Sequence, residues 1–207
     1  MMQKNLLIVF VKNPELGKCK TRLAATVGDE KALIFYKNML KHTKDVVADA
    51  NTHKYIFYSS FIDTHDLWPE NESFSKHLQS EGDLGDKMCK AFEQGFADGY
   101  QNICIIGSDC YALDAQMIDK AFDTLQDNKA VIGPSTDGGY YLLGMSQLIP
   151  EVFQNKQWST ETVTADTEAD LKRLNYSYQK LPALTDIDNE EDLKTIDSKV
   201  VESLFEA

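Results

Sequence analysis

The sequence predicts a three-layer α/β/α domain with a mainly parallel central sheet. Short apolar runs rich in branched residues alternate with longer segments whose apolar residues have helical spacing. Several of the apolar runs end in loops rich in Gly, Ser and Asp. In an open parallel sheet, ligands bind beyond the carboxyl ends of the strands. We therefore expect these polar loops to form one site at that edge.

The first half of the chain is expected to hold three strands and two helices. Residues 6–11 form a continuous apolar run closed by an Asn-Pro pair, which is typical of a strand buried on both faces. Asp29 can cap a helix that ends before residue 51. Residues 63–75 are polar and mixed, and predict little regular structure. The other elements of this half are a strand at residues 55–58, a helix near residues 84–96 and a strand at residues 103–106.

The second half continues the alternation. Asp114 can cap a helix with apolar residues at helical spacing. Two apolar runs then flank a glycine-rich loop. The elements expected after that helix are strands at residues 130–132 and 140–143, a helix at residues 163–174, a strand at residues 176–181 and a helix at residues 193–204.

Length and composition restrict the class of protein. The 207 residues are 43% hydrophobic and 26% charged, which predicts one domain over residues 1–207 that needs no disulfide or structural metal. The four cysteines lack paired spacing and suggest reduced thiols. A net charge of −12 argues against nucleic acid as the main partner. The longest apolar run is far shorter than the roughly 20 residues of a membrane span. We expect a soluble cytoplasmic protein.

The loop after the first strand, residues 12–22, is a candidate phosphate site. It carries four basic side chains and a glycine in an acidic protein, and one of them is among the two arginines of the chain. Backbone N–H groups, ammonium groups and a bidentate guanidinium together suit a di- or triphosphate. A solvated basic turn is the alternative. The spacing is that of neither a Walker loop nor a dinucleotide fingerprint. The candidates are Lys12, Gly17, Lys18, Lys20 and Arg22, with Lys20 and Arg22 in catalytic roles.

Three aspartates are candidate ligands of Mg²⁺ or Mn²⁺. Asp109 comes directly after a buried strand, where a hard cation that bridges phosphates can be held, and we also expect it to act in catalysis. Asp186 and Asp188 lie on the same side of an extended segment and could supply a second oxygen ligand. A turn or cap is the alternative role for Asp109.

Two more loops have the composition of binding loops. Gly82, Asp83, Leu84 and Gly85 suit packing against a base or ribose, although Asp83 could equally cap a helix. The second loop combines hydroxyls, a carboxylate and glycines that allow close approach of a ligand, and its alternative is a hairpin turn. Its candidate residues are Ser135, Thr136, Asp137, Gly138, Gly139 and Tyr140.

Taken in order, these segments resemble the bacterial glycosyltransferase-A-like proteins of the nucleotide-diphospho-sugar transferase superfamily. The resemblance extends from residue 6 to about residue 193. The first and last motifs also resemble phospholactate guanylyltransferases and, more distantly, molybdenum-cofactor guanylyltransferases. The segments that carry it are residues 10–23, 82–85, 107–110, 133–140, 158–160 and 186–188.

The resemblance implies a nucleotide bound over the first loop and a metal on Asp109. It also implies that Trp158, Ser159 and Thr160 join the loop at residues 135–140 in binding substrate. Two features differ from the family pattern. Tyr111 stands where a proline usually follows the Asp-Cys pair, and could reshape the floor beside the metal. The Asp-x-Asp pair is missing, so Asp109 would need a partner from residues 186–188.

The expected function is therefore metal-dependent transfer from a nucleotide sugar to a small acceptor. An alternative is nucleotidyl transfer from an NTP to a small phosphorylated acceptor. Both reactions require the protein to stabilise charge on phosphates, so the same ligands serve either one. A non-catalytic nucleotide-binding module is the third possibility.

Overall fold

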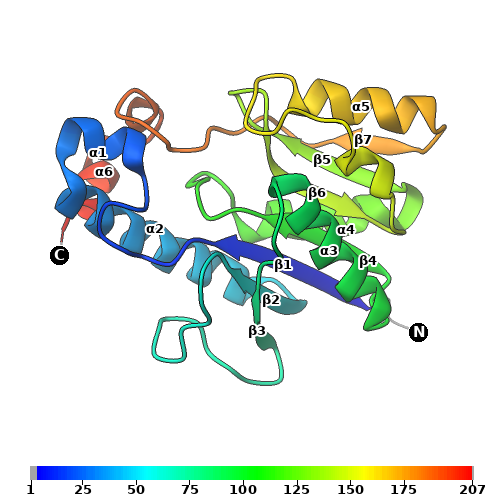
Figure 1. Ribbon diagram of the computed structural model, residues 1–207, viewed down its shortest axis with the longest axis horizontal. Helices are drawn as coiled ribbons and strands as arrows, with labels where there is room; N and C mark the ends of the chain where they lie inside the picture. The colour runs from blue at the N-terminus through cyan, green and yellow to red at the C-terminus, as the bar shows by residue number, and fades with distance from the viewer. Residues whose placement is uncertain (1–3, 207) are drawn as a thin grey trace.

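The computed structural model describes residues 4–206 and has a seven-stranded sheet at its centre. The strand order is β3-β2-β1-β4-β6-β5-β7, and β6 runs antiparallel to β4 and β5 while the other neighbours pair in parallel. Helices cover both faces of the sheet (Figure 1), so the predicted three-layer, mainly parallel fold is confirmed. The strands are β1 (Asn5–Val11), β2 (His53–Tyr58), β3 (Phe74–Leu78), β4 (Asn102–Ile106), β5 (Ala130–Pro134), β6 (Tyr140–Met145) and β7 (Tyr178–Lys180). The α-helices are α1 (Thr21–Val27), α2 (Asp29–Asp49), α3 (Leu84–Ala97), α4 (Ala115–Asp127), α5 (Val163–Arg173) and α6 (Ser198–Leu204), and two 3-10 helices are η1 (Pro150–Phe153) and η2 (Asp192–Thr195).

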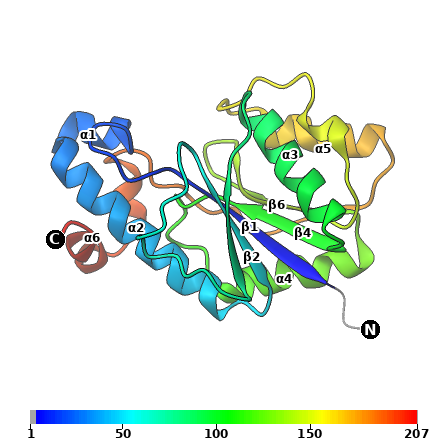
Figure 2. The same ribbon diagram turned by 60° about the horizontal axis from the view of Figure 1, so that its bottom comes forward.

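The strand β1 is buried on both faces, as its continuous apolar sequence predicts. Leu7 and Val9 pack into the core formed with α2 and α4, whereas Leu6 and Ile8 pack into the core formed with α3 and α5. Figure 2 shows α3 and α5 on one side of the sheet, with α2 and α4 on the other. Each fully buried side chain of this kind contributes about 1.5–3 kcal/mol. The position of β1 is therefore fixed from both sides, and so is the start of the loop that follows it.

Besides the short 3-10 helix η1, which was not predicted, three parts of the chain differ from the sequence-based expectation. The edge strand β3 begins inside the segment predicted to be irregular, because pairing with β2 on one side stabilises a strand that carries polar residues. The helix α1 forms within the basic loop and was not predicted. The expected C-terminal helix is interrupted: η2 ends at Thr195, and α6 starts anew after Asp197, whose carboxylate accepts a hydrogen bond from the Lys199 N–H at 2.9 Å.

The segment between β7 and α6, residues 181–197, is called the C-terminal arm below. It runs along the carboxyl edge of the sheet toward α1 and α2 (Figure 1). Leu184 pairs with Ser135, and the Ile187 N–H donates to the Asp109 carbonyl at 2.8 Å. The Ile187 side chain is buried with residues of α1, α2 and α6. The arm thus brings its carboxylates to the loop that follows β4. Among the residues described, no helix is long and apolar enough to cross a membrane.

Candidate functional site

A cavity of about 650 Å³ opens at the carboxyl edge of the sheet, where the polar loops meet. It lies beyond the ends of β1 and β4 and beside the start of β6, as expected for an open α/β sheet. Residues from every predicted binding loop line it, together with carboxylates of the C-terminal arm. The predicted site residues among its lining are Lys12, Lys20, Arg22, Gly82, Asp83, Leu84, Asp109, Asp137, Gly139, Tyr140, Trp158, Ser159, Thr160, Asp186 and Asp188.

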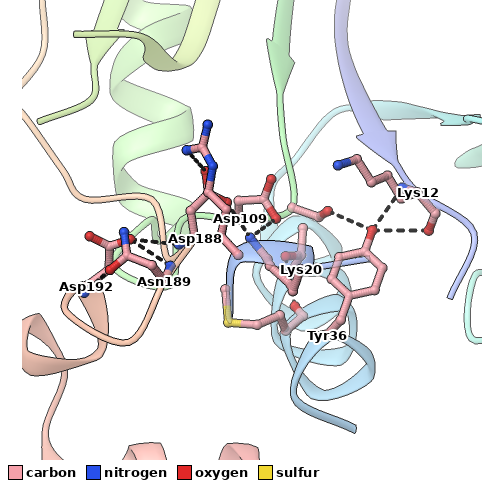
Figure 3. Close-up of polar contacts among 11 residues, drawn as sticks. Lys12, Lys20, Tyr36, Asp109, Asp188, Asn189 and Asp192 are labelled. Atoms are coloured by element: carbon pink, nitrogen blue, oxygen red, sulfur yellow. Dashed lines mark hydrogen bonds and ion pairs between the residues drawn. The ribbon is translucent and has the colours of Figure 1, made fainter. Parts of the chain in front are cut away.

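The start of the basic loop is held by a buried tyrosine of α2. The Tyr36 hydroxyl accepts a hydrogen bond from the Lys12 N–H at 2.8 Å and lies 3.1 Å from the Lys12 carbonyl, to which it can donate. It also lies 3.3 Å from the Ser108 hydroxyl in the loop after β4. Burial and the negative charge of Asp109 raise the pKa of Tyr36, so the hydroxyl stays protonated. One side chain therefore ties together the loops after β1 and β4 (Figure 3).

Lys20 lies between two of the predicted metal ligands. Its ammonium is 2.5 Å from Asp109 Oδ1 and 3.0 Å from Asp188 Oδ1, and its side chain is 3% exposed (Figure 3). Burial opposes the charge on Lys20, but the two carboxylates outweigh burial and raise the pKa of the ammonium. Its backbone is left-handed, with φ 49°, at the N-cap of α1. Lys20 thus joins the basic loop, the end of β4 and the C-terminal arm.

The other charged groups of the basic loop point in different directions. Arg22, in the first turn of α1, lines the cavity with its side chain 72% exposed and its guanidinium 3.8 Å from Asp188. Most of its donors are therefore open to a ligand. Lys18 does not line the cavity, and its ammonium pairs with Glu15 at 2.8 Å. Gly17 lies in the turn between them with φ 73°, and it too is outside the lining.

The C-terminal arm contributes two carboxylates to the cavity. Burial, followed by the negative charge of Asp109, raises the pKa of Asp186 to about 7. The backbone around Asp188 is fixed because Asp192 Oδ2 accepts hydrogen bonds from the N–H groups of Asp188 and Asn189 at 2.9 and 3.0 Å. Figure 3 shows this turn beside the Lys20 ion pairs. The expected same-side placement of residues 186 and 188 is consistent with both lining one cavity.

The donor set at this edge suits a hard cation bound by few protein ligands. Within residues 4–206, no group of three or more His, Cys, Asp or Glu side chains is arranged to hold a metal ion. Asp109 and Asp188 nevertheless share one cation, the Lys20 ammonium. Because both oxygens contact one nitrogen, they cannot be farther apart than the 2.5 Å and 3.0 Å contacts added together. Mg²⁺ often uses one or two carboxylates and completes its shell with substrate phosphates and water, so the pair fits such an ion.

Two aromatic side chains, Tyr140 and Trp158, line the cavity and are called its aromatic wall below. Trp158 packs against Gly85 in the first turn of α3, where a Cβ would come within 2.5 Å of the indole. Gly85 itself is outside the lining, so its role here is to seat the indole. Asp83 caps α3 by accepting a hydrogen bond from the Asp86 N–H at 2.9 Å, which confirms the alternative role of helix cap. Asp83 also lines the cavity. Tyr140 reaches Met88 Sδ at 3.8 Å, and burial raises its pKa.

The loop between β5 and β6 is only partly presented to the cavity. Asp137 lines the cavity and accepts a hydrogen bond from the Gly139 N–H at 2.9 Å, which forms the turn. Ser135 and Thr136 lie outside the lining, and Thr136 donates to the Thr185 hydroxyl at 3.1 Å in the C-terminal arm. Gly138 has φ 92° and sits against the backbone of Glu161, which leaves no room for a side chain. These residues support the loop, and Asp137, Gly139 and Tyr140 face the ligand space.

Comparison with known proteins assigns the chain to a family. A bacterial family with the description "Uncharacterized protein conserved in bacteria (DUF2064)" matches residues 42–160, more than half of the chain. The chain belongs to this family. A comparison with curated proteins finds no sequence match.

Solved structures extend the likeness beyond the family match. A protein of Desulfovibrio desulfuricans G20, provisionally assigned as a nucleotide-diphospho-sugar transferase, is 29% identical with a TM-score of 0.86, and the match covers 99% of this chain and 97% of that one. The expected resemblance to nucleotide-diphospho-sugar transferases is thereby confirmed.

Two cytidylyl-transferring enzymes share the fold alone. The 4-diphosphocytidyl-2C-methyl-D-erythritol synthase of Anaerococcus prevotii is 11% identical with a TM-score of 0.62, covering 96% of each chain. The inositol-1-phosphate CTP transferase of T. maritima is 13% identical with a TM-score of 0.58, covering 97% of this chain and 95% of that one.

The DUF2064 match and the cavity overlap only in part. Residues 42–160 include Asp109, the loop between β5 and β6, and Trp158. The basic loop and the C-terminal arm lie outside that range, although the loop provides Lys20 and the arm provides Asp188, one of its two carboxylate partners. Tyr111, which departs from the expected pattern, stacks on His42 at 4.1 Å and is outside the cavity lining.

Sequence reasoning missed several residues that line the cavity. Tyr36 and Met88 lie in segments predicted only as helices, yet both line the cavity. The hydroxyl of a buried tyrosine requires a partner, and this was the available signal for Tyr36. Gln79 follows β3, which the sequence did not predict, so its place at a strand end was hidden. The remaining missed polar residues are Thr21, Ser59, Lys87 and Ser108.

Proposed function

We propose that this protein transfers a sugar from a nucleotide-diphospho-sugar to a small acceptor in the cavity described above. The observation that carries the proposal is the composition of that one cavity, which is lined by basic loop residues, by carboxylates and by an aromatic wall. Its volume of about 650 Å³ is in the usual range for small-molecule sites. The likeness to the Desulfovibrio protein over nearly the full chain supports the same class of reaction.

The proposed chemistry depends on charge stabilisation by the basic loop. An acceptor hydroxyl attacks the anomeric carbon, and the bond from that carbon to the phosphate oxygen breaks. The nucleoside diphosphate leaves with the electron pair, and the proton of the acceptor hydroxyl passes to solvent. Arg22 is open to the cavity and can offer two parallel N–H donors to the leaving phosphates. Lys12 lines the same space, with its backbone fixed by Tyr36. We assign these two residues to the diphosphate.

The proposed cation ligands are Asp109 and Asp188, with Asp186 beside them in the lining. A divalent cation held there would supply positive charge to the departing phosphate oxygens. The support for this assignment is that Asp109 and Asp188 already contact one cation, Lys20, from two sides. The aromatic wall of Tyr140 and Trp158 is assigned to the sugar or acceptor.

Nucleotidyl transfer is the second candidate, and the fold shared with two cytidylyl-transferring enzymes favours it. In that reaction an acceptor phosphate attacks the α-phosphorus of an NTP and pyrophosphate leaves. The same basic loop would neutralise the triphosphate. The two reactions differ in the donor that the cavity binds, which is the basis of the test.

The first experiment measures thermal unfolding with a panel of sugar nucleotides and NTPs, with and without Mg²⁺ or Mn²⁺. Sugar transfer predicts a rise in Tm with a sugar nucleotide, because a ligand that binds only the folded state stabilises it. A rise with an NTP alone, followed by pyrophosphate release with a phosphorylated acceptor, replaces sugar transfer by nucleotidyl transfer. Binding without turnover of either kind indicates a non-catalytic nucleotide-binding module. Absence of any shift contradicts the assignment of a nucleotide site.

The chain offers a matched pair of variants for the phosphate contact, because it has two arginines. Arg22→Lys should weaken nucleotide binding about tenfold, since a point charge cannot replace a bidentate donor. Arg173→Lys is the control, because Arg173 pairs with Asp170 on α5 and is outside the cavity lining. Titration calorimetry with the nucleotide found in the screen measures the affinity of both variants. Equal affinity of Arg22→Lys and the unmodified protein removes Arg22 from phosphate binding.

The cation ligand is tested by Asp109→Asn, which keeps the shape of the side chain and removes its charge. We expect metal-dependent turnover to be lost and the Tm to fall only modestly, because the buried Lys20 ammonium keeps its contact with Asp188 at 3.0 Å. Retained turnover would reduce Asp109 to a partner of Lys20.

A further inference from the structure

The Lys20 ammonium occupies the place where a cation bridging Asp109 and Asp188 would sit. Its nitrogen lies 2.5 Å from one carboxylate oxygen and 3.0 Å from the other. A magnesium ion bound to the same two oxygens at about 2.1 Å would overlap this nitrogen. Lys20 and a divalent cation therefore cannot occupy the space between these two oxygens at the same time.

The charges around Lys20 leave the site attractive to a second cation. Four aspartates line the cavity: Asp109, Asp137, Asp186 and Asp188. The positive groups that contact the Asp109–Asp188 pair are Lys20 and Arg22. Arg22 is the looser of the two, at 3.8 Å from Asp188 and largely exposed. Removing Lys20 from the pair would leave two close carboxylates with only the 3.8 Å contact between Arg22 and Asp188, which is costly unless another cation binds.

Lys20 also belongs to the basic loop and lines the ligand cavity. An ammonium has three N–H donors, and the two carboxylates use two of them at most. A di- or triphosphate in the cavity offers a competing anion of higher charge. The long unbranched side chain can change rotamer while its backbone stays at the N-cap of α1.

We propose that Lys20 and a divalent cation exchange at the Asp109–Asp188 pair, so that the cation binds tightly only after nucleotide phosphates have taken up the Lys20 ammonium. This inference rests on the proposed nucleotide-dependent function for its second half. The first half, competition between Lys20 and the cation, depends on the observed ion pairs alone. The exchange keeps the acidic pair neutralised before the substrate arrives and makes cation binding depend on phosphate.

The experiment measures binding of Mn²⁺ alone, by the electron paramagnetic resonance signal of free Mn²⁺, so activity is not the readout. We expect the unmodified protein to bind weakly and Lys20→Met to bind at least tenfold more tightly. Lys20→Met/Asp188→Asn should lose that gain. Lys20→Arg keeps a positive charge at the pair and should remain as weak as the unmodified protein. Equal Mn²⁺ affinity of Lys20→Met and the unmodified protein overturns the proposal.

Lys156→Met is the matched control, because Lys156 is also buried, at 2% exposure, and pairs with Asp170 at 2.5 Å on another part of the molecule. It removes a buried lysine from a carboxylate without touching the cavity, and we expect no gain in Mn²⁺ affinity. Asp170 keeps its ion pair with Arg173 in this variant, so a gain equal to that of Lys20→Met would mean that the loss of any buried lysine strengthens Mn²⁺ binding, which contradicts the proposal. If Lys20→Met is unstable, Mn²⁺ should raise its Tm more than that of the unmodified protein, and an equal rise counts against exchange.

The second half is tested with pyrophosphate as the phosphate probe. Pyrophosphate should tighten Mn²⁺ binding in the unmodified protein by drawing the Lys20 ammonium away from the carboxylate pair. The effect should be much smaller in Lys20→Met, because that variant has no ammonium to displace. Formation of the soluble Mn²⁺–pyrophosphate complex is the same in both samples, so the difference between the proteins reports Lys20. An equal effect in both overturns the phosphate-driven exchange. A gain for Lys20→Met without any nucleotide binding in the thermal screen would leave the competition standing and defeat the proposed function instead.

Discussion

Single residues decide how the cavity wall is built, and Gly85 is the clearest case. A side chain at this position would come within 2.5 Å of three indole atoms of Trp158, so the absence of a Cβ lets the ring lie against α3. Glycine inside a helix ordinarily costs up to about 1 kcal/mol relative to alanine. The close approach of the indole explains why this cost is tolerated here. Trp158 is in turn one of the aromatic residues that line the cavity.

We predict that Gly85→Ala destabilises the protein by about 1–3 kcal/mol, because the added methyl group forces the indole to move. In a Trp68→Phe background the fluorescence comes from Trp158 alone, and its emission should shift as the ring is displaced. In a Trp158→Ala background the clash is gone, so Gly85→Ala should become neutral or stabilising. Urea unfolding of the four proteins of this cycle measures the coupling. Additive effects of the two substitutions would contradict the contact.

At the scale of elements, the edge strand β3 carries a half-buried histidine that packs against aromatic rings. His77 lies 4.3 Å from the ring of Tyr55 and stacks on Phe57 at 5.0 Å. The Gln94 amide lies 3.3 Å from His77 Nδ1 and can donate to it, while His77 Nε2 is buried without a hydrogen-bond partner among the described residues. Burial lowers the pKa of His77 from its ordinary value of 6.5, and the positive influence of His53 adds to this effect while Asp98 opposes it. The strand is therefore packed around a neutral imidazole.

The lowered pKa gives a signed prediction. The unfolded chain binds the proton more tightly than the folded one, so the stabilising contribution of neutral His77 is complete above about pH 6.5 and is lost as the pH falls toward the folded-state pKa. His77→Phe keeps the ring stacking and should reduce the loss of unfolding free energy between pH 7 and pH 5. His65→Phe, at an exposed position, is the control and should leave the pH dependence unchanged. Identical pH profiles for His77→Phe and the unmodified protein would show that His77 does not titrate differently on folding.

At the scale of the whole molecule, the C-terminal arm closes the site over the carboxyl edge of the sheet. Ile187 is 1% exposed and packs with Leu23, Phe35, Met39 and Leu204, which come from α1, α2 and α6. Its N–H also donates to the carbonyl of Asp109 at 2.8 Å. The hydrophobic contact and this hydrogen bond hold the flanking carboxylates of residues 186 and 188 beside the end of β4.

We predict that Ile187→Ala and Leu204→Ala each lower the free energy of unfolding by about 2–4 kcal/mol, because both side chains are buried in the same cluster. Only Ile187→Ala should also weaken binding of the nucleotide and Mn²⁺, since Leu204 lies in α6, away from the carboxylates. Urea unfolding and calorimetry measure the two effects separately. Equal loss of binding in both variants would mean that general stability, and not the arm, positions the site.

Local patterns in the sequence were sufficient for most of the fold. The buried strands at residues 6–11 and 103–106 were predictable because both faces of each strand are covered, which requires continuous apolar residues. Helix α4 was predictable because Asp114 caps it in the expected way, with its carboxylate 2.7 Å from the Met117 N–H. The edge strand β3 was not, because its stability comes from pairing with β2 and not from its own pattern.

The sequence by itself determined which loops reach the carboxyl edge, since strand ends and loop composition are local properties. Only the tertiary structure decided which side chains meet there. Lys20 was expected on a phosphate, yet it pairs with Asp188, 168 residues away, and with Asp109. Lys18 is one of the four basic residues of the loop, but it pairs with Glu15 and is outside the cavity lining. The physical reason is that an ion pair depends on the direction in which each side chain leaves its backbone, and that direction is fixed by packing between segments far apart in the chain.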